Sequence, residues 1–140
     1  MFLDYRMKTA LYAMLEPYKA LILSGHMHTS DFQKISDNIT EINIAGLCGA
    51  WWCGPVCCDG APVGYKIYEI DGDKITWQYK PSGLPMSHQF KFYVDDPLYD
   101  GYVVANVWDY DPQWKVEYFE DGVKVCDMER FKGQDPFAVE

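Results

Sequence analysis

From residue 20 to residue 28 the chain reads ALILSGHMH. Its first four residues are apolar without alternation, which is typical of a short strand buried on both faces of a sheet. The polar residues that follow lie where this strand ends, and open α/β folds build their sites at that rim. The sequence therefore predicts a buried strand over residues 20–23 with a candidate functional site directly after it.

His26 and His28 are the sharpest local signal for chemistry in the chain. In extended backbone, residues two apart point to the same side, so both imidazoles can approach neighbouring metal positions. Gly25 lets the backbone turn and leaves space for ions or phosphate oxygens. The alternative is a histidine pair at a strand end with no ligand role. The tetrapeptide alone leaves both possibilities open, because short motifs match by chance.

The elements around this strand follow from periodicity. An amphipathic helix is expected before it, with Asp4 as N-cap and Pro17 as the terminator. A polar stretch over 29–38 and a second apolar strand over 39–47 are expected after it. The apolar positions of the helix are Leu3, Met7, Leu11, Met14 and Leu15.

A long loop rich in Gly, Trp, Cys and Pro covers residues 48–64, and loops of this length are usually functional or disordered. A β-hairpin follows, with extended residues 65–70, a turn at 71–73 and alternating residues 75–79. This alternation predicts one buried and one solvated face.

After a connector at 80–85, every periodic segment is strand-like. The character of the sequence thus changes from mixed α and β to β alone, and we place a domain boundary near residue 87. Residues 88–140 number only 53, fewer than the roughly 100 of an immunoglobulin-like sandwich. The expected strands are 89–94, 102–110, 114–119 and 123–126.

The composition excludes several classes of protein. A formal charge of −9 disfavours nucleic-acid binding, which needs clustered Lys and Arg. The sequence has no run of about 18 apolar residues that could span a membrane. No signal peptide is expected either, because the N-terminus lacks the required order of basic, apolar and small residues. The compartment stays open, export of a longer parent included.

Four of the five cysteines fall within eleven residues, so the loop invites a metal or a disulfide interpretation. The Cys-X4-Cys-X3-Cys-Cys spacing lacks the paired short spacing of zinc sites. The plain alternative is packing, because small buried cysteines and tryptophans fill joints between elements. The cysteines are Cys48, Cys53, Cys57, Cys58 and Cys126, and their odd number leaves at least one unpaired in a monomer.

The motif at residues 24–28, SGHMH, resembles the closing Gly-His-X-His of calcineurin-like metallophosphoesterases. The loop CGAWWCGPVCCDGAPVGY at 48–65 resembles a subfamily in which a C-terminal β-domain follows the phosphoesterase core. The segments DG at 71–72, WQYK at 77–80, NVW at 106–108 and EDG at 120–122, together with Trp114, fit the same subfamily.

This resemblance implies a hydrolase acting on a phosphoester substrate with two divalent ions, Mn, Fe or Zn. His26 and His28 would bind different ions, and Trp51, Trp52 and Asp59 would line the substrate pocket. The family's other ligands come from upstream Asp-X-His, Gly-Asp and Gly-Asn-His motifs, and none of these precedes His26 here. The chain is therefore expected to be the C-terminal part of a parent enzyme, with no catalytic residue of its own, inactive alone and able to exist without metal.

The fold class implied is α+β and mostly β. Residues 1–87 would be the remnant of an α/β phosphoesterase core, with one helix and its closing strands, and residues 88–140 a small β-sandwich-like accessory domain. Such a remnant exposes apolar surface, so a homo-oligomer or strand exchange is expected to cover it. The alternatives are a non-catalytic β-rich accessory or interaction module, and a structural Cys/His metal protein.

Overall fold

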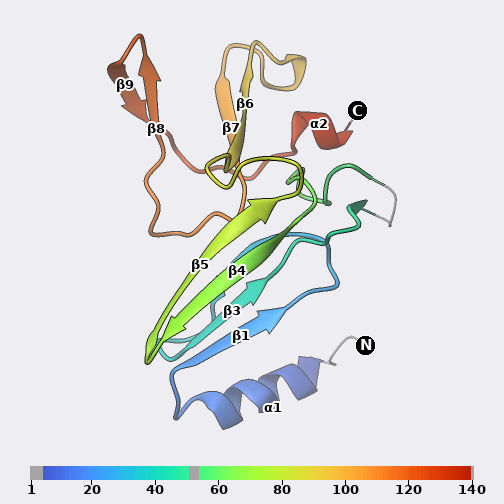
Figure 1. Cartoon of the computed structure of the whole chain (residues 1–140), viewed down its shortest axis with the longest axis vertical. Helices are drawn as coiled ribbons and strands as arrows, with labels where there is room; N and C mark the ends of the chain where they lie inside the picture. The colour runs from blue at the N-terminus through green and yellow to red at the C-terminus, as the bar shows by residue number, and fades with distance from the viewer. Residues whose placement is uncertain (1–4, 51–53, 140) are drawn as a thin grey trace.

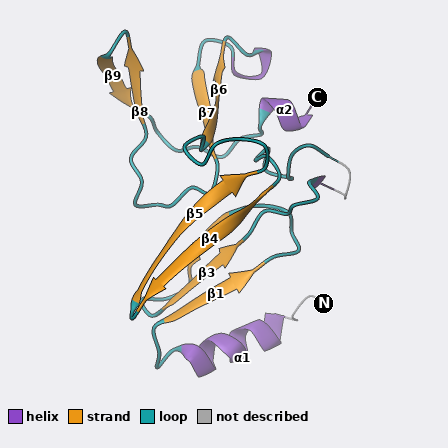
Figure 2. Cartoon of the chain, viewed as in Figure 1, coloured by secondary structure: helices purple, strands orange, loops and turns teal. Residues whose placement is uncertain are grey.

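The computed structural model describes residues 5–50 and 54–139. Within them the chain is mostly β, with one long helix, α1 (Tyr5–Leu15), and four small sheets. The helical turns η2 (Pro97–Tyr99) and α2 (Pro136–Val139) are short, and α1 and α2 lie toward opposite ends of the molecule with strands between them (Figure 2). The predicted mostly-β class with one principal helix is confirmed.

The helix α1 was predicted from its apolar spacing. It ends before Pro17, because a proline in the helix interior removes a backbone donor and crowds the preceding turn. Leu11 and Leu15 are half-buried, whereas Met7 and Met14 remain 54% and 74% exposed. The predicted positions Leu3 and Asp4 lie outside the described residues. The apolar stripe of α1 is thus only partly covered.

A three-stranded sheet follows the helix, in the order β1-β3-β2. β1 (Ala20–Ser24) runs parallel to β3 (Ile39–Asn43), and β2 (Asp31–Lys34) pairs antiparallel with β3. The predicted strand over 39–47 therefore ends early, and β2 falls within the stretch expected only to be polar.

β1 is less buried than its sequence predicts. It is an edge strand of the described sheet, and Leu23 is 49% exposed. The central strand β3 is the one with fully buried residues, since Ile39 and Ile42 are each 1% exposed. The expectation that β1 is buried on both faces is wrong for this chain, because none of its residues is fully buried.

The predicted hairpin is confirmed as β4 (Gly64–Asp71) and β5 (Lys74–Pro81). Asp71 pairs with Lys74, and Gly72 between them has a φ of 57°, which glycine adopts at no steric cost. Tyr79 is buried on one face while Gln78 is exposed on the other. The buried face contacts the sheet through Trp77, which stacks on Phe32 of β2 with ring centroids 6.3 Å apart.

Two further hairpins make up most of the C-terminal region, as Figure 1 shows at the top of the molecule. β6 (Phe90–Val94) pairs with β7 (Val103–Val107), and β8 (Glu117–Glu120) pairs with β9 (Val123–Asp127). All four strands were predicted, with shifts of their ends. The rings of Phe92 and Tyr118 connect the two hairpins at 5.8 Å between centroids.

The buried core joins segments from both sides of residue 87. Its members are Ala45, Cys57, Ala61, Tyr79 and Trp108. A buried ion pair between Lys66 of β4 and Asp109, just beyond β7, lies beside this core, with the two side chains 1% and 6% exposed. The domain boundary near residue 87 stays a prediction, and these contacts show that the segments on its two sides pack together.

Candidate functional site

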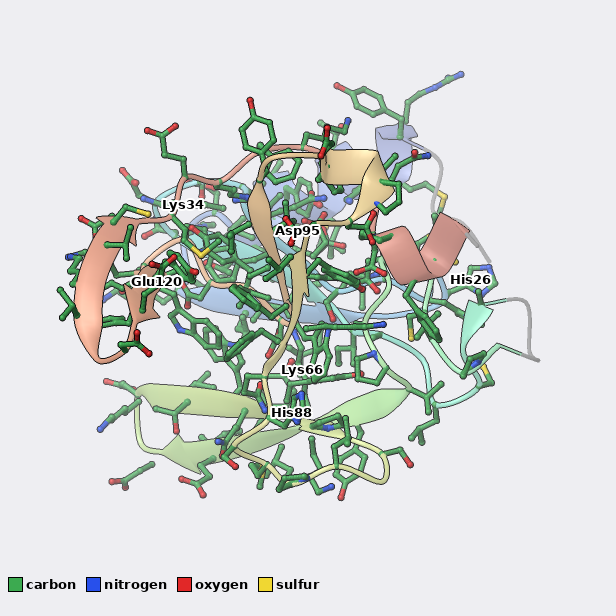
Figure 3. All side chains as sticks on the ribbon, turned by 90° about the horizontal axis from the view of Figure 1, so that it is seen from above. His26, Lys34, Lys66, His88, Asp95 and Glu120 are labelled. Carbon is green, nitrogen blue, oxygen red and sulfur yellow. The ribbon has the colours of Figure 1, made fainter. Side chains whose placement is uncertain are left out.

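The histidine motif lies immediately after β1, in a bend rather than in extended backbone. His26 has a φ of 86° and His28 a φ of 53°, both in the left-handed region. The expectation of extended backbone through this motif is therefore wrong, because β1 ends at Ser24. His26 is exposed at the edge of the molecule (Figure 3), and His28 is half-buried.

The ring of His28 is oriented by the long loop that follows β3. Its Nδ1 lies 2.5 Å from the carbonyl oxygen of Gly49. A carbonyl can only accept a hydrogen bond, so Nδ1 carries the proton in the neutral ring and Nε2 carries the lone pair. A Cβ on Gly46 would lie 3.4 Å from the His28 Cγ, so the ring packs directly on the Gly46 backbone.

Cys48 lies beside this ring. Its Sγ lies 3.9 Å from both Nδ1 and Nε2 of His28, so it is not aimed at either nitrogen. Among the described cysteines, Cys57 is buried and Cys58 is exposed, and both are free thiols. Burial raises the pKa of the Cys57 thiol to about 11, which makes it an inert packing residue. This agrees with the packing interpretation for that position, while Cys53 lies outside the described residues.

The backbone around the histidines is held by the same loop. The amide of Cys58 donates to the His28 carbonyl at 2.9 Å. The amide of Ser30 donates to Asp59 Oδ2 at 2.6 Å, and the amide of Ala61 donates to Asp59 Oδ1 at 3.1 Å. Burial raises the pKa of Asp59, and these hydrogen bonds oppose the rise by stabilising the carboxylate. Asp59 thus connects the loop that carries the histidines, residues 25–30, to the long loop that follows β3.

A second set of contacts ties this arrangement to the C-terminal region. Asn106 Nδ2 on β7 donates to the Asp59 carbonyl at 2.9 Å and to Asp135 Oδ2 at 2.7 Å. The Tyr93 hydroxyl on β6 donates to the same Asp135 carboxylate at 2.8 Å. Burial raises the pKa of Tyr93, and so does the hydrogen bond that its hydroxyl donates to the Asp135 carboxylate. The loop, β6, β7 and the segment before α2 therefore meet at Asp135.

Asp59 lines a cavity of about 130 Å³. Its wall includes Ser30, Asp31, Asn106, Trp108 and Arg130. Asp109 also lines it, and desolvation raises the pKa of this carboxyl while the Lys66 ammonium opposes the rise. The predicted substrate-pocket residue Asp59 lies at a cavity, but Trp51 and Trp52 fall outside the described residues. Their role as a substrate pocket stays a prediction.

The described residues do not complete a metal site. Across residues 5–50 and 54–139, no group of three or more His, Cys, Asp or Glu side chains is placed to hold an ion. His26 and His28 supply two imidazoles, and a pair of bridged ions needs carboxylates and more ligands than these. Two metal ions therefore do not fit the described residues of this chain by themselves. In the same range, no helix is long and apolar enough to cross a membrane.

Sequence patterns did not reveal the residues that anchor the loop. The Gly49 carbonyl is a backbone group, so no side-chain type marks it. Asn106 lies 47 residues beyond Asp59 in the sequence, so no local spacing connects the two. Asp109, which the sequence analysis did not single out, forms the buried ion pair with Lys66. One signal was available: Lys66 lies on the same strand face as Tyr68, so a charge was predictable on the buried side of the hairpin.

A family model described as the C terminal of calcineurin-like phosphoesterase matches residues 41–140. The chain therefore belongs to this family, as its sequence motifs predicted. The match includes Asp59 and Asn106, whereas His26 and His28 precede it. Neither the curated proteins nor the solved structures gave a match.

Proposed function

We propose that this chain is the C-terminal part of a phosphoester hydrolase with two divalent ions, Mn, Fe or Zn, in which His26 and His28 bind one ion each. One observation carries the proposal: the Gly-His-X-His motif at residues 25–28 directly follows β1, and His28 lies 13 residues before the family match begins. The orientation of His28 supports it, because metal-binding histidines commonly donate their second ring N–H to a carbonyl or a carboxylate.

The same proposal assigns the two halves of the chain. Residues 1–87 belong to the phosphoesterase core, and residues 88–140 form a small β-sandwich-like accessory domain whose two leaves are the hairpins β6–β7 and β8–β9. The carboxylate ligands come from polypeptide other than this chain, so the chain alone turns over no substrate. Trp51, Trp52 and Asp59 border the phosphoester in the complete enzyme.

The exposed surface of α1 and β1 supports an associated state. Met14 of α1, Leu23 of β1 and Met27 just after β1 are 74%, 49% and 54% exposed, and β1 offers an outer edge without a described partner strand. A second copy of the chain, or strand exchange between copies, covers this surface. Sedimentation should show a dimer or larger species, and a strictly monomeric, highly soluble chain would contradict this part of the proposal.

A phosphatase assay with manganese tests the catalytic proposal. The chain alone should be inactive, and a longer form that includes the upstream core should hydrolyse a phosphoester such as p-nitrophenyl phosphate. In the longer form, His28→Gln should abolish turnover. His88→Gln is the matched control, because His88 is exposed and stacks on Trp108 at 5.3 Å instead of joining the motif. Equal turnover in both variants would show that His28 is not a metal ligand.

A second candidate is a non-catalytic interaction module, and the hairpins favour it. Phe90, Phe92 and Val94 alternate along β6 with 50%, 42% and 52% exposure. Val123 and Val125 of β9 are 70% and 54% exposed. Apolar strips of this kind mark surfaces that bind other proteins. A longer form that folds, binds manganese weakly and shows no turnover with any phosphoester would favour this candidate.

A further inference from the structure

The β4–β5 hairpin, which crosses the middle of the molecule in Figure 1, carries a groove that the proposed function does not use. Its volume is about 350 Å³, within the roughly 300–1,000 Å³ of small-molecule sites. We propose that this β4–β5 groove binds the ring of a neutral sugar, which stacks on Trp114 and forms hydrogen bonds with polar side chains of the hairpin. The proposal goes beyond phosphoester hydrolysis and needs neither a metal ion nor turnover.

The floor of the groove is set by the register of the hairpin. Two neighbouring cross-strand pairs form it: Ile67 with Gln78, and Glu69 with Thr76. All four are exposed, because strand residues alternate and the core takes the other face, where Tyr79 is 1% exposed. Cross-strand partners lie about 5 Å apart and the next pair about 7 Å along the strands. The floor thus has the width of a single sugar ring.

Trp114 lines the groove with an indole that is 42% exposed. Its backbone is anchored by a turn on the buried Asp111. The amide of Trp114 donates to the Asp111 carbonyl at 2.9 Å, and the amide of Gln113 donates to Asp111 Oδ1 at 2.8 Å. An aromatic side chain on an anchored turn loses little freedom when a ligand binds. The face of a sugar ring that presents C–H groups suits stacking on such an indole.

Gln89 adds an acceptor to the same groove. Its Nε2 donates to the Tyr79 carbonyl at 2.8 Å and to the Met86 carbonyl at 2.6 Å. Both partners are carbonyl oxygens, which only accept, so the two hydrogens of this amide are used within the chain. Only Oε1 of Gln89 can therefore meet a ligand, and it asks for a donor such as a hydroxyl group.

The charges around the groove disfavour ions. Among the described residues that line it, Glu69 is the only charged one, so an anion would meet a carboxylate and no cation. Organic cations prefer cages of aromatic faces, but the ring of Trp77 is engaged by Phe32 and Tyr68, each at 6.3 Å between centroids. A sugar hydroxyl both donates and accepts, so it matches the carboxylate, hydroxyl and amide groups of this groove.

Binding can be measured by ¹H–¹⁵N spectra of the labelled chain. The probes are methyl β-D-glucoside, methyl β-D-galactoside, methyl α-D-mannoside and N-acetyl-D-glucosamine. At least one should shift the Trp114 indole N–H signal with a Kd of about 1 mM, as expected for about a dozen non-hydrogen atoms. Trp114→Ala should weaken this binding about tenfold or more, followed at the amides of Ile67 and Gln78. Tyr102→Ala is the control, because Tyr102 is an exposed aromatic outside the groove, and it should leave the Kd unchanged.

Gln78→Leu is the second variant, in case Trp114→Ala fails to fold. It removes the amide at an exposed strand position and should weaken the same sugar by about 3–10-fold, with unchanged β1–β3 amide signals as the check on folding. Unshifted groove signals with all four sugars would overturn the proposal, and so would an unchanged Kd in the folded variants. Glucuronate or choline bound as tightly as the best neutral sugar would overturn the choice of a neutral ligand. Because the titration contains no phosphoester, an inactive longer form would refute the proposed function alone.

Discussion

Replacing Lys66 by methionine should be among the most damaging single changes in this chain. Methionine keeps the length of the side chain and removes its charge, which leaves the Asp109 carboxylate buried at 6% exposure without its ammonium partner. The neighbouring Asp111 is also buried and adds repulsion. Unpairing a buried ion costs about 3–5 kcal/mol, a large fraction of the roughly 5–15 kcal/mol that stabilises a typical domain.

The pH dependence gives this prediction its signature. Without Lys66, desolvation and the nearby Asp111 carboxylate act on Asp109 unopposed, so its folded pKa rises further above the unfolded value of about 3.9. A carboxyl with a raised folded pKa contributes stability that is fully present below the unfolded pKa and lost as pH rises through the folded pKa. The penalty of Lys66→Met should therefore be smaller near pH 4.5 than at pH 7.

Urea unfolding followed by tryptophan fluorescence measures both effects. The double variant Lys66→Met with Asp109→Asn should recover most of the loss, since removing both charges can be nearly neutral. Asparagine suits this position because Asp109 has a φ of 59°. Lys74→Met is the control, because Lys74 is exposed and should change stability by no more than about 0.5 kcal/mol. A loss below about 1 kcal/mol at pH 7 in Lys66→Met, or a double variant as unstable as the single one, would refute the argument.

Three further changes test other parts of the structure. Gly64→Ala should lower the thermal midpoint at a cost of about 1–3 kcal/mol, because the added Cβ would lie 2.5 Å from the Tyr79 hydroxyl; an unchanged melting curve would show that the site has room. Cys57 should be alkylated far more slowly than the exposed Cys58, as followed by mass spectrometry. Since the pKa of Cys57 is raised to about 11, the native state holds its proton longer than the unfolded chain. Its contribution of up to about 2.7 kcal/mol should therefore be lost between about pH 9 and pH 11, and Cys57→Ala should flatten that decline. Met14→Lys should shift the sedimentation profile toward monomer, because it places a charge on the exposed stripe of α1; an unchanged profile would place the contact elsewhere.

The hairpin β4–β5 was predictable because two local signals agreed. Alternating residues over 75–79 matched the period of a strand with one buried face, and Asp71-Gly72 supplied the turn. β2 was missed because Phe32 is its one apolar residue. It forms through pairing with β3 and through the contact between Phe32 and Trp77, which are tertiary effects that local periodicity does not contain.

The candidate site was predictable in its residue types and not in its geometry. Gly-His-X-His could be located by inspection, but the backbone on either side of Thr29 is held by hydrogen bonds to residues 58 and 59, about 30 positions away. Asp59 was expected to face substrate, and the structure shows both its carboxylate oxygens bonded to backbone amides. Hydrogen bonds between distant segments depend on the folded arrangement, so they cannot be predicted from the local pattern of a single sequence.

The carboxylate of Asp135 has a practical consequence for anyone preparing this protein. It receives hydrogen bonds from Tyr93 and Asn106 and from the amide of Phe137. A protease that trims the tail at Lys132 would leave every strand in place and still remove this shared acceptor. Preparations should therefore be checked by intact mass before any metal titration, and a purification tag is better fused ahead of α1 than behind α2.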